Sequence, residues 1–292
     1  MLARLFRAEI YKILGNRWAT GFLVWIFPVG ALGFLVVFNL ILLISNPLQE
    51  NIVSQGPLEW TGAMVGVWAF ANNPIGRLFF LGFAAVLFGG EYQWNTWKNV
   101  VPRSWRVPLL FIKFAGVAAF VVFAFALMSV IMMISSGISA AIAGVSYGPA
   151  INGEALGDFA QDYGLAVFTT FIAVVIGAGY AAIAAMLTRS ILGSVIGSFV
   201  FMFAEGASIA GFAFVAWVTG TDSILGWYRV TPTYNLINVA SWISDDEPFA
   251  YDLPNGDEVS FTLGVSLLVL AVTVTVLFGL ASYFFQRQDI TN

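Results

Sequence analysis

The sequence contains no cysteine and no histidine. Without cysteine, the chain can form neither a disulfide nor a thiolate metal site. Without histidine, it lacks the commonest general base, the base of a Ser–His nucleophile pair and the commonest metal ligand. We therefore expect neither a catalytic residue nor a metal site in this chain.

Charge is also scarce, at 10% of the 292 residues, whereas hydrophobic residues make up 60%. Soluble domains average about 45–50% apolar residues, and a mean hydropathy of +0.88 leaves too little polar surface for a soluble protein. A helix needs about 20 apolar residues to cross a bilayer. The apolar runs predict an all-α integral membrane protein, a single transmembrane domain over residues 1–292 with six transmembrane helices. The predicted spans lie near residues 19–44, 75–90, 109–134, 162–187, 191–218 and 261–285.

The few charges divide between the gaps that separate these spans. Ten of the twelve Lys and Arg residues lie in or beside the terminal segments and alternate gaps, and twelve of the sixteen acids lie in the other gaps. Cytoplasmic loops carry the excess of Lys and Arg, so this division predicts a multi-pass protein of the cell membrane with both termini cytoplasmic. The acidic outer face has two interpretations. It attracts a cationic substrate, or acids collect where bases are excluded.

Three connecting segments have distinct compositions. Residues 1–18 predict an interfacial helix whose cations lie near anionic lipid headgroups, so membrane lipid and not nucleic acid is the expected partner of these bases. The four predicted anchors are Arg4, Arg7, Lys12 and Arg17. Residues 62–71 are apolar but too short to span, and could rest on the outer leaflet. The outer loop 219–260 predicts a re-entrant pair of short helices over 223–243, followed by an acidic, turn-rich second half.

The gap at residues 91–108 is the only substantial cytoplasmic loop that this topology predicts. Residues 91–100 can form helical turns that Pro102 ends, and Trp94 and Trp97, three apart, would share one helix face. A short interfacial helix with exposed bases suits docking by a cytoplasmic motor subunit. A loop that only anchors to headgroups has the same appearance.

The motifs of this loop resemble those of a known family. Glu91 ends the second span, a turn containing Thr96 follows, and Lys113 opens the third span; between them come Pro102, Arg103, Ser104 and Arg106. This order resembles the permeases of the type 2 export family of ATP-binding cassette transporters, over essentially the whole chain. Two positions depart from the family pattern: the glycine usual before the threonine is Asn95, and Trp105 interrupts the Ser-Arg pair. The ends of the chain, with Glu9, Lys12 and Arg17 near the start, also resemble the family's.

The resemblance implies that the loop is a short coupling helix that docks on cytoplasmic ATPase subunits. The residues implied in coupling are Glu91, Trp94, Thr96, Trp97, Lys98, Pro102, Arg103, Ser104 and Arg106. It further implies a translocation pathway formed with a second copy of the chain or a homologous permease. The chain has no G-x-x-x-x-G-K-[ST] phosphate-binding motif, so ATP and magnesium are expected on the partner and no cofactor on this chain. The alternative is a non-transporting sensor or assembly module that uses the same dock. An intramembrane protease would need a histidine base or paired membrane acids, which are missing.

Polar residues within the spans are the other candidate sites. Glu205 lies about fourteen residues into the fifth span, near the bilayer centre, where a carboxylate is costly and is by default a functional hypothesis. Arg77 is its candidate partner if the second span starts earlier than residue 75. Otherwise Glu205 is protonated or hydrogen-bonded at a helix break before Gly206. Asn39 is the third pathway candidate, or a hydrogen-bonding contact between helices. The G-x-x-x-G motif at 193–197 predicts close packing, within one subunit or across a dimer.

Overall fold

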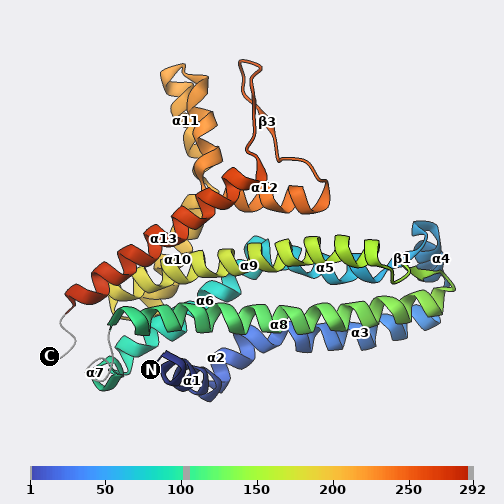
Figure 1. Ribbon diagram of the computed structural model, residues 1–292, viewed down its shortest axis with the longest axis horizontal. Helices are drawn as coiled ribbons and strands as arrows, with labels where there is room; N and C mark the ends of the chain where they lie inside the picture. Colours follow the sequence, from blue (N-terminus) through green and yellow to red (C-terminus); the bar gives the residue numbers. More distant parts are fainter. Residues whose placement is uncertain (1, 101–105, 289–292) are drawn as a thin grey trace.

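The computed structural model describes residues 2–100 and 106–288, and the chain is 84% helical. Figure 1 shows the arrangement of the elements. The first half comprises α1 (Leu2–Gly15), α2 (Arg17–Thr20), η1 (Gly21–Trp25), α3 (Ile26–Ile44), α4 (Asn46–Gln55), β1 (Leu58–Glu59), α5 (Trp60–Asn72), α6 (Pro74–Gln93), α7 (Trp97–Val100) and α8 (Arg106–Ala143). The second half comprises β2 (Tyr147–Gly148), α9 (Gly153–Thr188), α10 (Ile191–Gly206), α11 (Ser208–Thr219), η3 (Asp222–Val230), α12 (Pro232–Ser244), β3 (Tyr251–Asp252), β4 (Glu258–Val259) and α13 (Leu263–Arg287).

Five helical segments of the described chain are long and apolar enough to cross a membrane, and a sixth span is formed if the bent pair α10–α11 counts as one. The five are Gly21–Ile44, Ile75–Gln93, Arg106–Ala143, Gly153–Thr188 and Leu263–Arg287. The fifth predicted span is therefore broken: α10 and α11 meet at an angle of 49°. The chain is a multi-pass, all-α membrane protein.

α8 and α9 are much longer than the spans predicted for them. They contain 38 and 36 residues, about 57 and 54 Å at ~1.5 Å per residue, against about 30 Å of hydrocarbon. The third span was predicted to end at residue 134, and Ser135, Ser136 and Gly137 follow that point. The helix continues through them because Ser135 and Ser139 have hydrogen-bond partners inside the protein.

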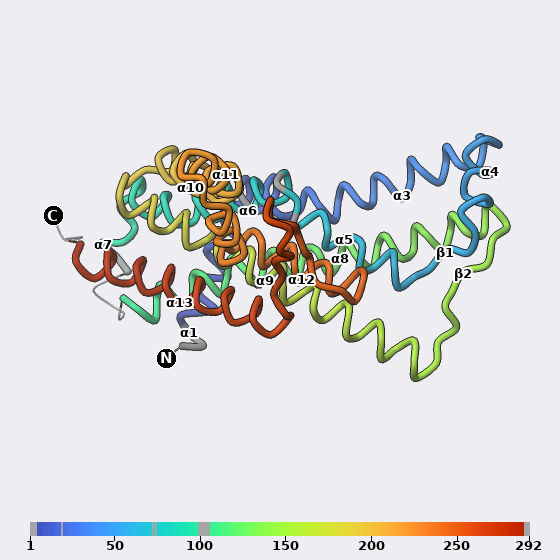
Figure 2. Tube along the Cα trace, turned by 90° about the horizontal axis from the view of Figure 1, so that it is seen from above, coloured from blue at the N-terminus to red at the C-terminus, as the bar shows by residue number. Residues whose placement is uncertain are grey.

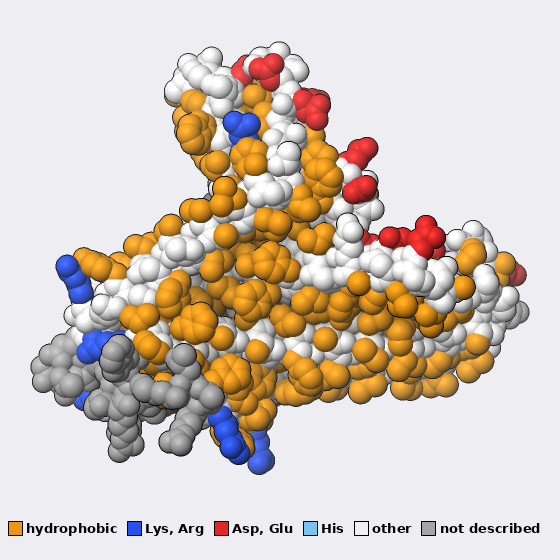
Figure 3. All heavy atoms as spheres, viewed as in Figure 1, with side chains coloured by type: hydrophobic (Ala, Val, Ile, Leu, Met, Phe, Trp, Pro, Cys, Tyr) orange, Lys and Arg blue, Asp and Glu red, His pale blue; other side chains and the backbone are white. Residues whose placement is uncertain are grey.

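The ends of the helices far from the chain termini form two diverging arms (Figure 1). One contains α3, α5, α8 and α9, which run side by side away from α7 and the chain ends (Figure 2). The other contains α11, α12 and the β3–β4 hairpin. In Figure 3, most basic side chains in view gather at the end where the termini lie, one lies on the arm that contains α11, and the acidic side chains lie on the two arms. The described charges therefore separate in space as the sequence predicted.

Two predicted packing roles are resolved by contacts within the chain. The apolar stretch 62–71 belongs to α5, which packs against α8 and α9 and buries Trp68 to 1% exposure, so it is part of the core and does not rest on the outer leaflet. The G-x-x-x-G motif of α10 packs on α9, because a Cβ at Gly197 would lie 2.7 Å from the Cβ of Ala184. This face is consequently occupied by packing within one chain.

Asn39 is a hydrogen-bonding contact between α3 and α8. Its amide nitrogen donates to Ser135 Oγ at 3.0 Å and its amide oxygen accepts from Ser139 Oγ at 2.9 Å. All three side chains are buried. A buried amide satisfied in this way stabilises helix association in a membrane, so Asn39 ties the outer halves of two helices together.

The segment 219–260 forms a cap far from the chain termini, which we call the outer cap after the side that the charge pattern predicts for it. Its first half is a pair of short helices, η3 and α12, as predicted, and its second half forms the β3–β4 hairpin. Tyr234 is completely buried at its centre; its hydroxyl donates to Phe249 O at 2.8 Å and accepts from Phe261 N at 3.1 Å. Burial raises the pKa of Tyr234 above its usual value, so this phenol is held neutral inside the cap.

Candidate functional site

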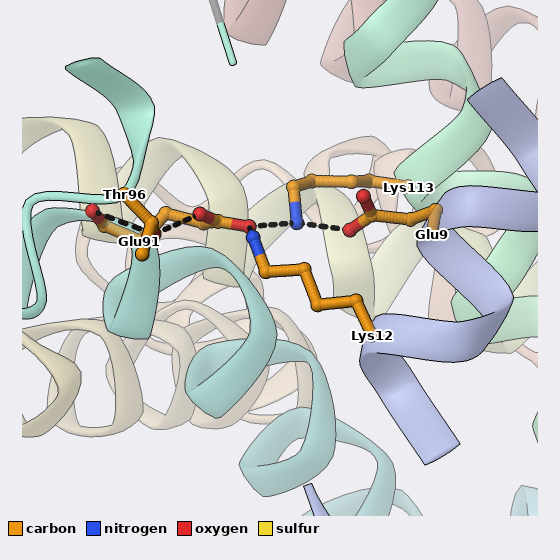
Figure 4. Close-up of polar contacts among 5 residues, drawn as sticks. All are labelled: Glu9, Lys12, Glu91, Thr96 and Lys113. Atoms are coloured by element: carbon orange, nitrogen blue, oxygen red, sulfur yellow. Dashed lines mark hydrogen bonds and ion pairs between the residues drawn. The ribbon is translucent and has the colours of Figure 1, made fainter. Parts of the chain in front are cut away.

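Four charged side chains from three helices meet at the end of the molecule where the termini lie (Figure 4). Glu9 and Lys12 come from α1, Glu91 from the last turn of α6, and Lys113 from the second turn of α8. Lys113 Nζ donates to Glu91 Oε1 at 2.5 Å and also to Glu9 Oε1. Lys12 Nζ donates to the same oxygen of Glu91. We call these four residues the ion cluster.

Burial of the ion cluster carries a desolvation cost that its ion pairs must offset. Glu9, Glu91 and Lys113 are 6%, 3% and 2% exposed. An ion removed from water is costly unless it is paired and hydrogen-bonded. Here the two acids and two bases balance, and every charge has a partner. Lys12 is the cluster's contact with solvent, because its side chain is 40% exposed and lines a cavity of about 330 Å³ together with Gly15 and Trp94.

The turn after α6 fastens the loop to the ion cluster. Thr96 Oγ1 donates to Glu91 Oε2, and Thr96 N donates to Glu91 O at 3.0 Å. Asn95 has φ +53°, the left-handed conformation, which asparagine tolerates better than most residues. Asn95 is thus a residue that permits this turn. The resemblance implies a coupling helix over 91–106; among the described residues of that range, α6 ends at Gln93, α7 forms a single turn and α8 begins at Arg106.

This turn separates the two tryptophans that were expected to share a face. Trp97 is 2% exposed and lies 4.6 Å from the ring of Phe285, centroid to centroid. Lys113 Nζ lies 5.3 Å from the Trp97 ring centroid, close enough for a cation–π contact. Trp94, in contrast, is 57% exposed. The shared-face prediction is wrong because the left-handed residue at 95 reverses the chain between them.

The loop therefore has an inner and an outer set of residues. Glu91, Thr96 and Trp97 point inward, and Trp94, with Asn95 and Lys98, forms an exposed tip. Three further predicted coupling residues, Pro102, Arg103 and Ser104, lie outside the described residues. So does the side chain of the predicted anchor Arg4.

Arg106 connects the loop to the C-terminal helix. Its Nη1 donates to the carbonyl oxygens of Phe285, Gln286 and Gln288 at 2.8, 2.9 and 2.8 Å. The last carbonyls of a helix have no partner within the helix, and a cation there is favourable to the helix dipole. The predicted coupling residue Arg106 thus caps α13.

The remaining predicted anchors differ in their surroundings. Arg7 is exposed and donates to Tyr11 on the same helix at 3.2 Å, and Arg17 is exposed; both can face headgroups. Lys12 instead pairs with Glu91, so its assignment as a headgroup anchor alone is incomplete. Sequence periodicity could not identify this pair because its members are 79 residues apart.

The pathway candidates Arg77 and Glu205 line one cavity between α6 and α10. The sequence left open whether the second span starts early enough for the two to meet. α6 begins at Pro74, and the shared cavity places Arg77 near Glu205. No group of three or more acidic side chains within the described ranges could hold a metal ion.

The fold and composition define the class as a multi-pass, all-α membrane protein. No protein-family model matches the chain, and no curated protein matches it either.

Proposed function

We propose that this chain is the membrane-spanning permease subunit of an ATP-driven exporter, and that it docks a separate cytoplasmic ATPase through the loop after α6. The observation that carries the proposal is the mounting of the exposed tip, Trp94 to Lys98, on the buried ion cluster. A loop that only touched headgroups would need no buried charges beneath it. Here a displacement of the tip is transmitted to Glu91 by the hydrogen bond from Thr96 Oγ1 to the Glu91 carboxylate.

The ion cluster transmits such a displacement to three helices. Glu91 belongs to α6, Lys113 to α8 and Glu9 to α1, and Arg106 extends the connection to α13. Because buried, mutually paired charges separate only at high cost, these helix ends move together. In the proposal, a dimer of this chain, or of this chain with a homologous permease, forms the pathway, and the partner ATPase binds ATP and magnesium.

The test uses the absence of a phosphate-binding motif in this chain. The full chain is extracted from its native membrane with its bound partners and transferred to nanodiscs, and Mg-ATP hydrolysis by the sample is measured. Because this chain has no phosphate-binding motif, any hydrolysis must come from a bound partner. The double variant W94A/K98E should lose at least about tenfold of this activity, equivalent to ~1.4 kcal/mol of binding, with an unchanged thermal midpoint.

The matched control is W227A, because Trp227 is a similarly exposed tryptophan, at 62%, in the outer cap. It should retain the hydrolysis. Native mass spectrometry of the same sample should show two permease chains per complex. A wild-type sample without ATP hydrolysis, or a W94A/K98E sample with full hydrolysis, would contradict the proposal. A complex that hydrolyses ATP but contains a single membrane chain would favour the sensor or assembly alternative.

A further inference from the structure

Polar side chains from several helices meet where the broken span bends. Glu205 is the penultimate residue of α10, and α11 leaves at 49°. Tyr180 of α9 donates to Glu205 Oε2 at 2.5 Å, and Thr233 of α12 donates to Glu205 Oε1 at 2.5 Å. Both carboxylate oxygens are therefore held from different helices at the last turn before the bend.

Arg77 of α6 lines the same cavity as Glu205. Its Nε is buried and has no hydrogen-bond partner within the described part of the chain, and no ion pair there joins its guanidinium to a carboxylate. A guanidinium stays charged in proteins, and a charge at membrane depth needs a counter-charge. Glu205 is the one acid that lines this cavity.

The space between the two groups fits a water molecule. The cavity measures about 20 Å³, and one water needs at least ~10–15 Å³ together with polar partners. Arg77 Nε supplies a donor, and the carboxylate of Glu205 supplies an acceptor. A bridging water is enthalpically nearly as good as a direct hydrogen bond.

We propose that Arg77, one bridging water and Glu205 form a latch that holds α10–α11 in its bent form by tying the bend to α6. No proline forces the bend: the break at 206–208 contains none, and Ala207, at φ −82° and ψ −2°, lies at the edge of the helical region, from which it can return to ordinary helical angles. Beyond the bend, α11 packs against η3, the helix that follows it in the chain, and Ala216 is its only buried residue, so the α11–η3 pair can move as one unit. The latch therefore sets the direction of the α11 arm.

The geometry gives the size of the movement that the latch prevents. α11 has 12 residues, about 18 Å at ~1.5 Å per residue. Straightening the 49° bend would displace its far end by up to about 15 Å for a rod of that length. The inference concerns the shape of one chain, so it holds or fails independently of the permease proposal.

The test measures the distance between the two arms. The chain contains no cysteine, so cysteines introduced at Trp217 and Ile151, which are 79% and 78% exposed, carry the only spin labels. The wild-type background should give one narrow distance distribution in nanodiscs. R77Q and E205Q should each add a second population displaced by up to ~15 Å, the span of the swing of a rod as long as α11.

Two further results distinguish a latch from general destabilisation. R77Q/E205Q should change the distribution no more than either single variant, because residues that act as a pair are not additive. R229Q is the matched control, since Arg229 stacks 5.1 Å from the Phe261 ring in the outer cap, and it should leave the distribution unchanged. Additive effects, or wild-type distances in R77Q and E205Q, would overturn the latch. If the charge variants fail to fold, R77K keeps the positive charge but removes the Nε donor of the latch; it should still add the second population, and a wild-type distribution there overturns the proposal.

Discussion

Removal of the Lys113 ammonium is the sharpest test of the ion cluster. K113M keeps an apolar stem of similar length but leaves Glu9 without its cation and Glu91 with Lys12 alone. Breaking a buried ion pair by removing one partner costs about 3–5 kcal/mol, because the other charge remains buried and uncompensated. Lys113 serves two carboxylates and is 2% exposed, so we expect the upper part of that range.

The charge balance of the cluster provides a compensating variant. K113M leaves two acids and one base, and adding E9Q restores one of each, Lys12 with Glu91. K113M/E9Q should therefore recover most of the stability that K113M loses, within about 1–2 kcal/mol of the wild type, because well-matched neutral groups can replace a buried pair at little cost.

Unfolding of the detergent-solubilised protein, followed by fluorescence of its ten tryptophans, measures these differences. K98M is the control: Lys98 is exposed on the tip, and a surface substitution changes stability by no more than about 0.5 kcal/mol. The reasoning is refuted if K113M unfolds at the wild-type midpoint, or if E9Q destabilises K113M further.

Three further predictions concern backbone geometry and titration. N95G should match the wild type in unfolding midpoint, whereas N95V should lose about 1–2 kcal/mol, the cost of a left-handed conformation for most side chains, because φ at Asn95 is +53°. G89A should lower the midpoint by about 1–3 kcal/mol, as overpacking does, since a Cβ at Gly89 would lie 2.8 Å from the Cα of Ile191; an unchanged midpoint would contradict this close approach. Burial raises the pKa of the Tyr234 phenol in the folded cap, so Tyr234 of the unfolded cap loses its proton first, at about pH 10. The stability of the cap, followed by near-ultraviolet circular dichroism, should therefore be constant below that pH and decrease above it. Y234F should remove part of that decrease.

Apolar runs and charge placement predicted the membrane helices because both are local properties of the sequence. The five long apolar helices and the bent pair α10–α11 overlap the six predicted spans. The proximity of Arg77 to Glu205 was also within reach, since an isolated charge at membrane depth calls for an opposite one. Helix ends were less predictable: α8 runs to Ala143 because its serines find partners on α3, which hydropathy does not register.

The ion cluster could be predicted only in part. Glu91 and Lys113 stood out as charges at span ends, but their joining with Glu9 and Lys12 depends on how α1 packs beside α8. The direction of the loop side chains was beyond periodicity altogether, because the single left-handed residue Asn95 decides that Trp97 faces inward. Long-range pairing and one backbone angle therefore account for what the sequence did not reveal.

The length of α8 has a mechanical consequence. Near its beginning, α8 is fixed by the salt bridge of Lys113 with Glu91, and far along its length it is hydrogen-bonded to Asn39 of α3. The helix therefore behaves as a lever whose fulcrum is the buried salt bridge. A tilt of about 5° at that fulcrum displaces the far end of the helix, ~45 Å beyond Lys113, by about 4 Å. Small displacements at the clamped end are thus magnified at the opposite end, and α3 is carried with it.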